Sequence, residues 1–279
     1  LKQYWDIAMI SWPAKLVTDI ARRTCVLYIG AGISANSQSA DGQRPLTWEA
    51  FLRRCLPKVT SEESKLYAES LLAEHDMLNA CEVIINAIGT VDFGEEAKNS
   101  FKRPGFQPAE IHKAIYNIDS RFLITPNVDS IYDQHAISMS HGTILIKKYN
   151  DNEISNSFRT QDRIILKAHG TVDEPACMVF SRKQYNDARY KYANFYRILD
   201  SLALTHTYIF LGCGINDPDI KLTLENNSFW FPGSHPHYFI AAKQSTNDDL
   251  KKILKDNCNL ETLTYNNDAG DHKFLLESL

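Results

Sequence analysis

The sequence lacks any hydrophobic run that approaches the ~18 residues needed to cross a bilayer. Its first residues also lack a basic stretch followed by an apolar one, which a signal peptide would have. We therefore expect no membrane segment, no secretion signal and a cytoplasmic location. The chain begins at Leu1 rather than at Met, which leaves open a trimmed start or a longer parent chain.

Closely spaced cysteines are also missing. The chain has six cysteines, and no two of them stand two residues apart as structural zinc sites usually require. Cys25, Cys81 and Cys213 lie within apolar runs, where a thiol behaves as a small buried hydrophobe. We expect a reducing compartment, no disulfides, no zinc and no other metal site.

An excess of positive charge is absent as well. The net charge is -4, so we expect no membrane partner and no nucleic-acid binding by this chain alone. Hydrophobic residues make up 44% and charged residues 23% of the 279 residues, which is typical of a globular protein. This length suits one large α/β domain with an inserted module, or two small domains.

What the chain does have is a series of apolar runs of strand length, separated by longer amphipathic segments. Near-continuous hydrophobicity is typical of parallel strands that are covered on both faces. The alternation predicts an α/β fold with a Rossmann-like, doubly wound and mostly parallel sheet. The expected strands are Cys25–Ile29, Arg121–Thr125, Thr143–Lys147, Ile164–Ala168, Thr207–Leu211, His237–Ala241 and Leu260–Thr264.

The alternation is interrupted at about 48–117, where helical patterns replace strands. Thr60 with Glu63 predicts a helix start with a capping box. Helical spacing also predicts one buried helix face, formed by Ala80, Val83, Ile84, Ala87 and Ile88. We interpret this stretch as an all-helical insertion in a domain that spans 20–279.

Residues 1–19 would form an N-terminal extension to that domain. The extension is rich in aromatic and apolar residues, among them Tyr4, Trp5, Ile7 and Trp12. It either packs on a neighbouring subunit or folds back on its own domain, and the sequence leaves both open.

Two short glycine motifs follow predicted strands. Gly30-Ala31-Gly32 comes after the first strand, and Gly212-Cys213-Gly214 comes after the fifth. Glycine lets backbone N–H groups approach a phosphate closely. A tight turn without a ligand explains each motif as well, and Asp217-Pro218 after the second also fits a helix start.

Polar side chains follow two further strands. Asn127 and Asp129 lie two residues apart, so both side chains could face one site, although an Asx turn that caps a helix near Ser130 is the simpler explanation. His169 follows the fourth strand, and histidine is a residue type that suits general-base work. Other histidines, such as His235 and His237, are predicted to be surface or turn residues.

The motifs together, in their order along the chain, resemble those of the sirtuin family. The motifs are Gly-Ala-Gly-Ile-Ser at 30–34, Thr-Pro-Asn-Val-Asp at 125–129, His-Gly at 169–170 and Gly-Cys-Gly at 212–214. The match is most similar to a divergent bacterial branch whose members degrade NAD in antiphage defence. Each motif is weak alone, but the four in this order are specific.

The resemblance implies roles for the matching residues. Asn127 would position the nicotinamide ribose and the attacking water, and His169 would act as general base. Asp129 would bind the nicotinamide carboxamide. Residues that would contact the rest of NAD are Gly30, Ala31, Gly32, Ser34, Thr125, Gly212, Cys213 and Gly214.

Two departures from protein-deacylating sirtuins are visible. The stretch Ala35-Asn36-Ser37-Gln38-Ser39 replaces their Ile-Pro-Asp-Phe-Arg segment, and their four-cysteine zinc module is missing. The resemblance therefore implies an NAD glycohydrolase that releases nicotinamide and ADP-ribose, rather than a deacylase. It also implies a homo-oligomer and a HerA-type ATPase partner. Two alternatives stay open: a sensor or scaffold that binds NAD or ADP-ribose without turnover, and a nuclease subunit working with a motor ATPase.

Overall fold

The protein folds around one seven-stranded sheet. A computed structural model describes residues 8–215 and 217–279. The strand order is β3-β4-β2-β1-β5-β6-β7, and all of the described neighbours pair in parallel. The predicted Rossmann-like α/β fold is confirmed. The strands are β1 Cys25–Ile29, β2 Phe122–Thr125, β3 Leu145–Lys148, β4 Ile164–Lys167, β5 Thr207–Leu211, β6 His237–Ala242 and β7 Leu260–Tyr265.

The strand bounds agree with the predicted runs to within one or two residues. The largest difference is at β3, which begins at Leu145 rather than at Thr143. Thr143 belongs to the turn before the strand, because its backbone N–H and its hydroxyl both donate to the Ser140 carbonyl. Sequence hydrophobicity does not register such a local turn.

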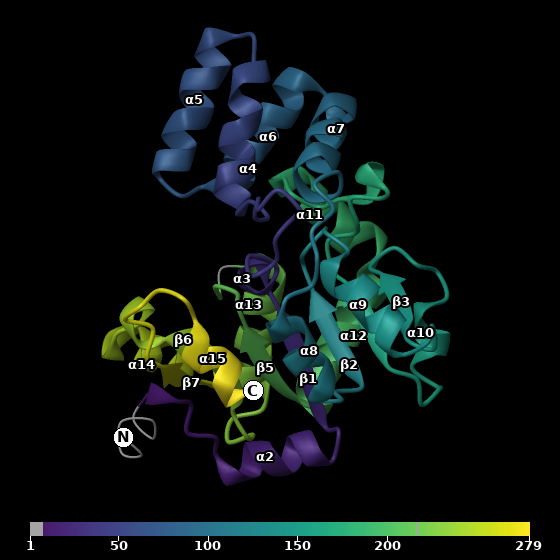
Figure 1. The fold of residues 1–279 in the computed structure, drawn as a ribbon, viewed down its shortest axis with the longest axis vertical. Coiled ribbons are helices and arrows are strands. Elements are labelled where there is room, and N and C mark those ends of the chain that lie inside the picture. The colour runs from purple at the N-terminus through teal and green to yellow at the C-terminus, as the bar shows by residue number, and fades with distance from the viewer. Residues whose placement is uncertain (1–7, 216) are drawn as a thin grey trace.

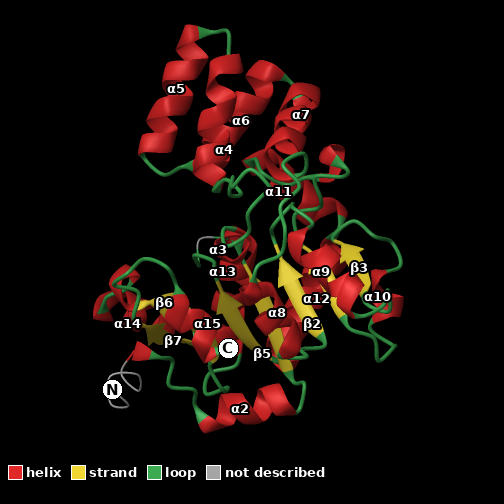
Figure 2. Cartoon of the chain, in the orientation of Figure 1, coloured by secondary structure: helices red, strands yellow, loops and turns green. Residues whose placement is uncertain are grey.

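Alternate residues of the central strands point to opposite faces of the sheet, and helices cover both faces (Figure 2). Val26 and Tyr28 of β1 pack on one face, whereas Cys25, Leu27 and Ile29 pack on the other. The first face is covered by α11 Arg182–Lys191, α12 Ala193–Thr205, α13 Pro218–Trp230 and α14 Asp248–Cys258. The second is covered by α2 Ala14–Ala21, α8 Glu110–Asn117, α9 Ile131–Met139 and α15 Lys273–Ser278.

Between β1 and β2 the chain forms a helical module that projects from the sheet (Figure 1). The module has its own hydrophobic core, and loop residues Val128, Val172, Met178 and Phe180 enter that core from the strand ends. The module therefore covers the loops that follow β2 and β4. Its helices are α4 Trp48–Cys55, α5 Glu62–Ala73, α6 Met77–Ile88 and α7 Thr90–Phe101.

Two details predicted for this module are wrong. Helix α5 is capped by Ser61, whose hydroxyl accepts from the Ser64 N–H, rather than by Thr60. The buried face of α6 is also rotated from the predicted one. It consists of Ala80, Cys81, Ile84 and Ile85, whereas Ala87 is exposed and Val83 and Ile88 are partly buried. Packing against α4 and α5 selects this face, and the sequence of α6 alone does not contain that information.

The described part of the N-terminal extension packs on its own domain. Ile10 is buried, and its N–H donates to the Ser278 hydroxyl. The Trp12 indole donates to the Ser278 carbonyl at 2.9 Å. Tyr4, Trp5 and Ile7 lie outside the described residues.

One predicted surface histidine is in the core. His237 begins β6, is buried, and accepts a hydrogen bond from the Tyr208 N–H through Nδ1. Burial lowers the pKa of His237 to about 4, because the charged form would lose its hydration. His235 is exposed, as predicted.

The remaining elements are short. They are α3 Ala31–Ser34, η1 Leu56–Lys58, α10 Ile154–Ser157, η2 Pro175–Cys177 and η3 Lys243–Ser245. Within the described residues, no helix combines the length and apolarity that a membrane span would need.

Candidate active site

The four sequence motifs meet at the carboxyl ends of four adjacent strands. Strands β4, β2, β1 and β5 are neighbours in the sheet. Strands β2 to β4 lie on one side of β1 and strands β5 to β7 lie on the other, so the carboxyl end of β1 is a topological switch point. A cavity of about 400 Å³ lies there. Its lining includes all predicted site residues except Thr125: Gly30, Ala31, Gly32, Ser34, Asn127, Asp129, His169, Gly212, Cys213 and Gly214.

The two glycine turns pack directly against each other. The Gly32 N–H donates to the Gly212 carbonyl at 2.7 Å, and the Gly30 N–H donates to the Leu211 carbonyl at 2.9 Å. A Cβ added to Gly30 would lie 2.4 Å from the Cβ of Cys213. This close approach requires glycine whether or not a ligand binds, and the N–H groups of Gly30 and Gly32 already have backbone acceptors.

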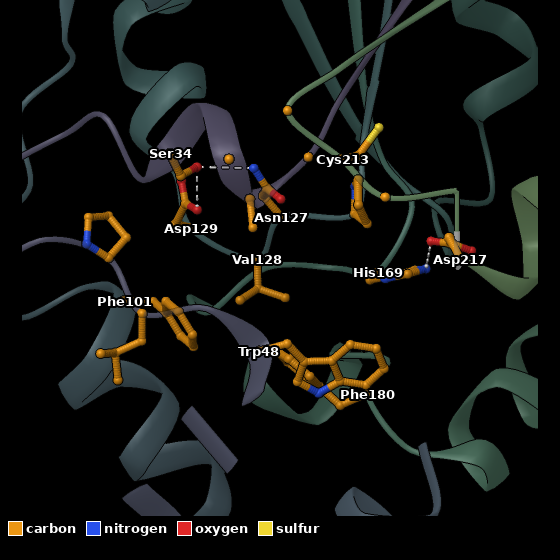
Figure 3. Close-up of a pocket in the computed structure, with 18 of the residues that line it drawn as sticks. Ser34, Trp48, Phe101, Asn127, Val128, Asp129, His169, Phe180, Cys213 and Asp217 are labelled. Atoms are coloured by element: carbon orange, nitrogen blue, oxygen red, sulfur yellow. Dashed lines mark hydrogen bonds and ion pairs between the residues drawn. The ribbon is translucent and has the colours of Figure 1, made fainter. Parts of the chain in front are cut away.

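Ser34, Asn127 and Asp129 form what we call the asparagine half of the cavity (Figure 3). The Asn127 amide donates to the Ser34 hydroxyl at 3.0 Å, and that hydroxyl donates to Asp129 Oδ2 at 2.9 Å. Asp129 Oδ1 accepts from the Ile131 N–H at 3.1 Å, so the predicted Asx turn is present at the start of α9. The same carboxylate therefore satisfies the first N–H of the helix and, through Ser34, orients the asparagine.

Thr125 lies beneath this half rather than in the cavity. It is buried, its hydroxyl donates to the Ile29 carbonyl at 2.8 Å, and the same oxygen accepts from the Asn127 N–H at 3.1 Å. Thr125 thus joins β1 to β2 and fixes the start of the asparagine loop. The structure does not bring its side chain to the cavity lining.

A buried lysine binds the loop that carries Asn127 and Asp129. Lys167 at the end of β4 is only 1% exposed, and its Nζ donates to the Asp129 carbonyl at 2.6 Å. The same Nζ pairs with the Asp133 carboxylate at 2.9 Å. The pKa of Asp133 is raised, chiefly by burial, while the charge of Lys167 acts in the lowering direction. The hydrogen bond anchors the loop after β2 to strand β4, and the charge pair anchors helix α9 to the same strand.

His169 and Asp217 lie across the cavity from Asn127 (Figure 3). Together with Tyr185, which also lines the cavity, they form the histidine half. His169 is buried, with Nε2 3.3 Å from Asp217 Oδ2 and Nδ1 3.4 Å from the Tyr185 hydroxyl. Gly170 allows the chain to turn away after the histidine. Its φ is +74°, and a Cβ there would lie 2.3 Å from the Cys177 carbonyl oxygen.

The rest of the lining is apolar and comes partly from the helical module. Trp48 and Phe180 meet edge to face with ring centroids 6.2 Å apart, and Phe101, Val128 and Leu46 extend this wall. The ionisable carboxyl groups of the lining belong to Asp129 and Asp217. Among the described residues, no lysine or arginine lines the cavity. The lining therefore favours a positively charged group.

A metal ion has one possible set of ligands in the described part of the chain. Ligand atoms of His169, Asp217 and Asp219 all lie within 4.8 Å of one another. Asp219, however, already forms a short charge-assisted bond with Arg189, which supplies a positive charge to this cluster. That the site works without a metal remains a prediction.

Sequence reasoning did not assign site roles to three residues beside the motifs. Lys167 stands out as the charged residue in the apolar run Ile164–Ala168, a signal that a buried charge needs a partner. Asp217 and Tyr185 give no such signal. They reach His169 only because the ends of β4 and β5 and helix α11 converge in space.

Comparison with known proteins agrees with this geometry. A model of the family described as SIR2-like domain matches residues 121–263, about half of the chain. A protein named NAD(+) hydrolase ThsA from Enterococcus faecium is 25% identical over 85% of this chain and 45% of its own length. The protein of that name from Acinetobacter baumannii is 23% identical over 84% and 45%, respectively.

A third relative, defense-associated sirtuin 2 of Bacillus subtilis, is 22% identical over 89% of this chain and 24% of its own length. The chain thus spans less than half the length of these curated relatives. The family model includes both the asparagine motif and the histidine motif, and it covers strands β2, β3, β4, β5 and β6. The chain belongs to the SIR2-like domain family.

Proposed function

We propose that this chain hydrolyses NAD at the nicotinamide–ribose bond, giving nicotinamide and ADP-ribose. The observation that carries the proposal is that Asn127 and His169, from the ends of β2 and β4, line one cavity beside two glycine turns. Two relatives named NAD(+) hydrolase support the same reaction. Gly30, Ala31, Gly32, Ser34, Asp129, Gly212, Cys213 and Gly214 would contact the nucleotide.

The reaction breaks the bond between the anomeric carbon and the pyridinium nitrogen. The bonding electron pair leaves with nicotinamide, which becomes neutral, and the oxygen of water bonds to the anomeric carbon. One proton of that water passes to His169 and then to solvent. Asn127, fixed by Ser34, would orient the water or the ribose without changing its own charge.

The charge distribution of the cavity suits this chemistry. The transition state carries positive charge on the ribose ring, and carboxylates at Asp129 and Asp217 stabilise such charge. The nicotinamide ring of NAD is itself cationic and would stack against the aromatic wall of Trp48 and Phe180. The diphosphate would be repelled by the carboxylates, which leaves the glycine turns as the place for it.

The test is to incubate the purified protein with NAD and to separate the products by chromatography. We expect nicotinamide and ADP-ribose in equal amounts. Asn127→Ala and His169→Ala should each lower the rate about 100-fold or more. His235→Ala and Asn117→Ala, at exposed positions outside the cavity, are matched controls and should keep full activity. Unchanged rates in both site variants, with intact folding, would reject the assignment.

We also propose the wider setting of this activity. The relatives named as NAD(+) hydrolase and defense-associated sirtuin support a role in depleting NAD during antiphage defence, in the cytoplasm where NAD is found. The resemblance further suggests a homo-oligomer, a HerA-type ATPase partner, and a sirtuin-like domain at 20–279 behind an extension at 1–19. Light scattering of the protein alone and with the ATPase tests the assembly: a lone monomer that binds no ATPase would contradict it.

A further inference from the structure

Asp217 is held in place from two sides besides the histidine. Its Oδ1 accepts from the Asp219 N–H at 2.9 Å and so caps helix α13. Its Oδ2 accepts from the Tyr28 hydroxyl at 3.1 Å and lies 3.3 Å from His169 Nε2. The side chain is only 12% exposed. The carboxylate is therefore fixed before any ligand binds, and its third contact is the imidazole.

The two ring nitrogens of His169 have different surroundings. Nε2 is buried, and within the described residues it makes no hydrogen bond of good geometry, so the Asp217 carboxylate is the acceptor in reach for its proton. Nδ1 faces the Tyr185 hydroxyl at 3.4 Å, which is long for a hydrogen bond and weak. With Nε2 buried beside Asp217, Nδ1 is the ring nitrogen that remains to accept a proton.

The cluster around this pair already contains its own cation. Asp219 is buried, and burial followed by the charge of Asp217 raises its pKa. Arg189 binds the Asp219 carboxylate directly. The charge of Asp219 is therefore compensated within the protein, and Asp217 is left to face His169. This arrangement favours an aspartate–histidine pair over a metal site made of the same residues.

We propose that Asp217 is a positioning residue for His169. It accepts from Nε2–H, which holds the neutral imidazole in one tautomer with Nδ1 as the proton acceptor. When Nδ1 takes the proton of the attacking water, Asp217 stabilises the imidazolium that forms. The kinetic part of this inference rests on the proposed hydrolysis of NAD, whereas the pairing itself does not.

The first test is Asp217→Asn, which keeps the size of the side chain and the oxygen that caps α13. It replaces the oxygen that faces Tyr28 and His169 with an NH2 group, which cannot accept a hydrogen bond. We expect kcat to fall about 10- to 100-fold with little change in KM. The matched control is Asp76→Asn, because Asp76 caps α6 through its carboxylate and does not line the cavity. A wild-type kcat in Asp217→Asn would overturn the proposal.

The second test reads the tautomer directly and needs no turnover. Protein labelled with ¹⁵N in the histidine rings is examined by NMR, and His169→Gln assigns the His169 signals. We expect the proton on Nε2 in the wild type and a mixture of tautomers in Asp217→Asn. A proton on Nδ1 in the wild type, or the same tautomer in both proteins, would overturn the pairing.

The same spectra test the metal alternative. If EDTA abolished activity and shifted the His169 signals, and Zn²⁺ or Mg²⁺ alone restored both, then His169 and Asp217 would be ligands and the proposal would be wrong. We expect EDTA to change neither. If the protein did not cleave NAD, the proposed function would be wrong. The NMR spectra would still show whether Asp217 and His169 are paired, because they report the tautomer of His169 without turnover.

Discussion

The two halves of the cavity are held in different ways. In the asparagine half, direct hydrogen bonds of 2.6 to 3.1 Å run from buried Lys167 through Asp129 and Ser34 to Asn127. In the histidine half, His169 meets its partners at 3.3 and 3.4 Å. The difference suits their proposed roles, because an amide that orients a substrate must be fixed, whereas a base must exchange protons and partners during each cycle.

The largest effect should come from breaking the anchor of the asparagine half. Lys167→Met leaves the Asp133 carboxylate buried without its charge partner, which should lower the free energy of unfolding by about 3–5 kcal/mol. Chemical denaturation measures it. The double variant Lys167→Met with Asp133→Leu is the control and should recover most of the loss, since it removes both charges. Equal instability of the two variants would contradict the buried pair.

The same variant should respond to pH in a defined direction. The pKa of Asp133 is raised in the folded protein, chiefly by burial, and losing the lysine charge removes an influence that lowers it. Asp133 of the folded variant then binds a proton more tightly than in the unfolded chain, so the contribution of this group to stability is present at low pH and is lost as pH rises. The difference in free energy of unfolding between the variant and the wild type should therefore decrease from pH 7 towards pH 4. A difference that did not change with pH would argue against Asp133 as its cause.

In the histidine half, a substitution that disturbs the backbone should have a larger effect than one that removes a side-chain contact. Gly170→Ala forces a Cβ against the Cys177 carbonyl at a φ of +74°, which should cost about 1–3 kcal/mol of stability and displace His169. Gly42→Ala is the control, because Gly42 also has a positive φ but nothing lies near its added Cβ. Equal thermal midpoints for the two variants would show that the contact with Cys177 has no effect.

Cutting the link between Asn127 and Asp129 should affect activity more than folding. Ser34→Ala removes the hydroxyl that both side chains share, and loss of one such bond corresponds to about a 10-fold fall in kcat/KM. Steady-state kinetics with NAD provides the measurement. A full rate in this variant would mean that Asn127 is oriented by the substrate rather than by Ser34.

The smallest effect should come from Tyr185→Phe. The variant removes the hydroxyl at 3.4 Å from His169 Nδ1 but keeps the ring that packs edge to face on the imidazole. Because that hydrogen bond is long, we expect only about a 2- to 5-fold fall in kcat. A fall as large as that of His169→Ala would instead place the tyrosine hydroxyl in the proton transfer.

The sequence correctly predicted the features that depend on local residue patterns. Apolar runs of strand length predicted the strands, and they are most continuous in inner strands such as β1 and β5, which are covered on both faces. The ends of those strands then located Asn127, His169 and both glycine turns. The buried face of α6 and the cap of α5 were predicted wrongly, since neighbouring helices and turn geometry decide them.

The contacts within each half were beyond sequence reasoning. The strand order places the end of β5 near that of β4 only through β2 and β1, so nothing in the sequence indicated that Asp217 would face His169. Thr125 was assigned to the ligand because it belongs to a motif, but its hydroxyl is used inside the sheet. The spacing of the motif residues identifies the loops that they occupy, but the direction of each side chain depends on the folded structure.

The most direct test is a crystal structure of His169→Ala soaked with NAD. We expect the nicotinamide ribose between Asn127 and the position of the missing imidazole, with the diphosphate at the turns of Gly32 and Gly212. The opposite end of the sheet has a second cavity of about 440 Å³ that includes Asn227 and His237. NAD bound there, with the cavity beside Asn127 left empty, would contradict the account.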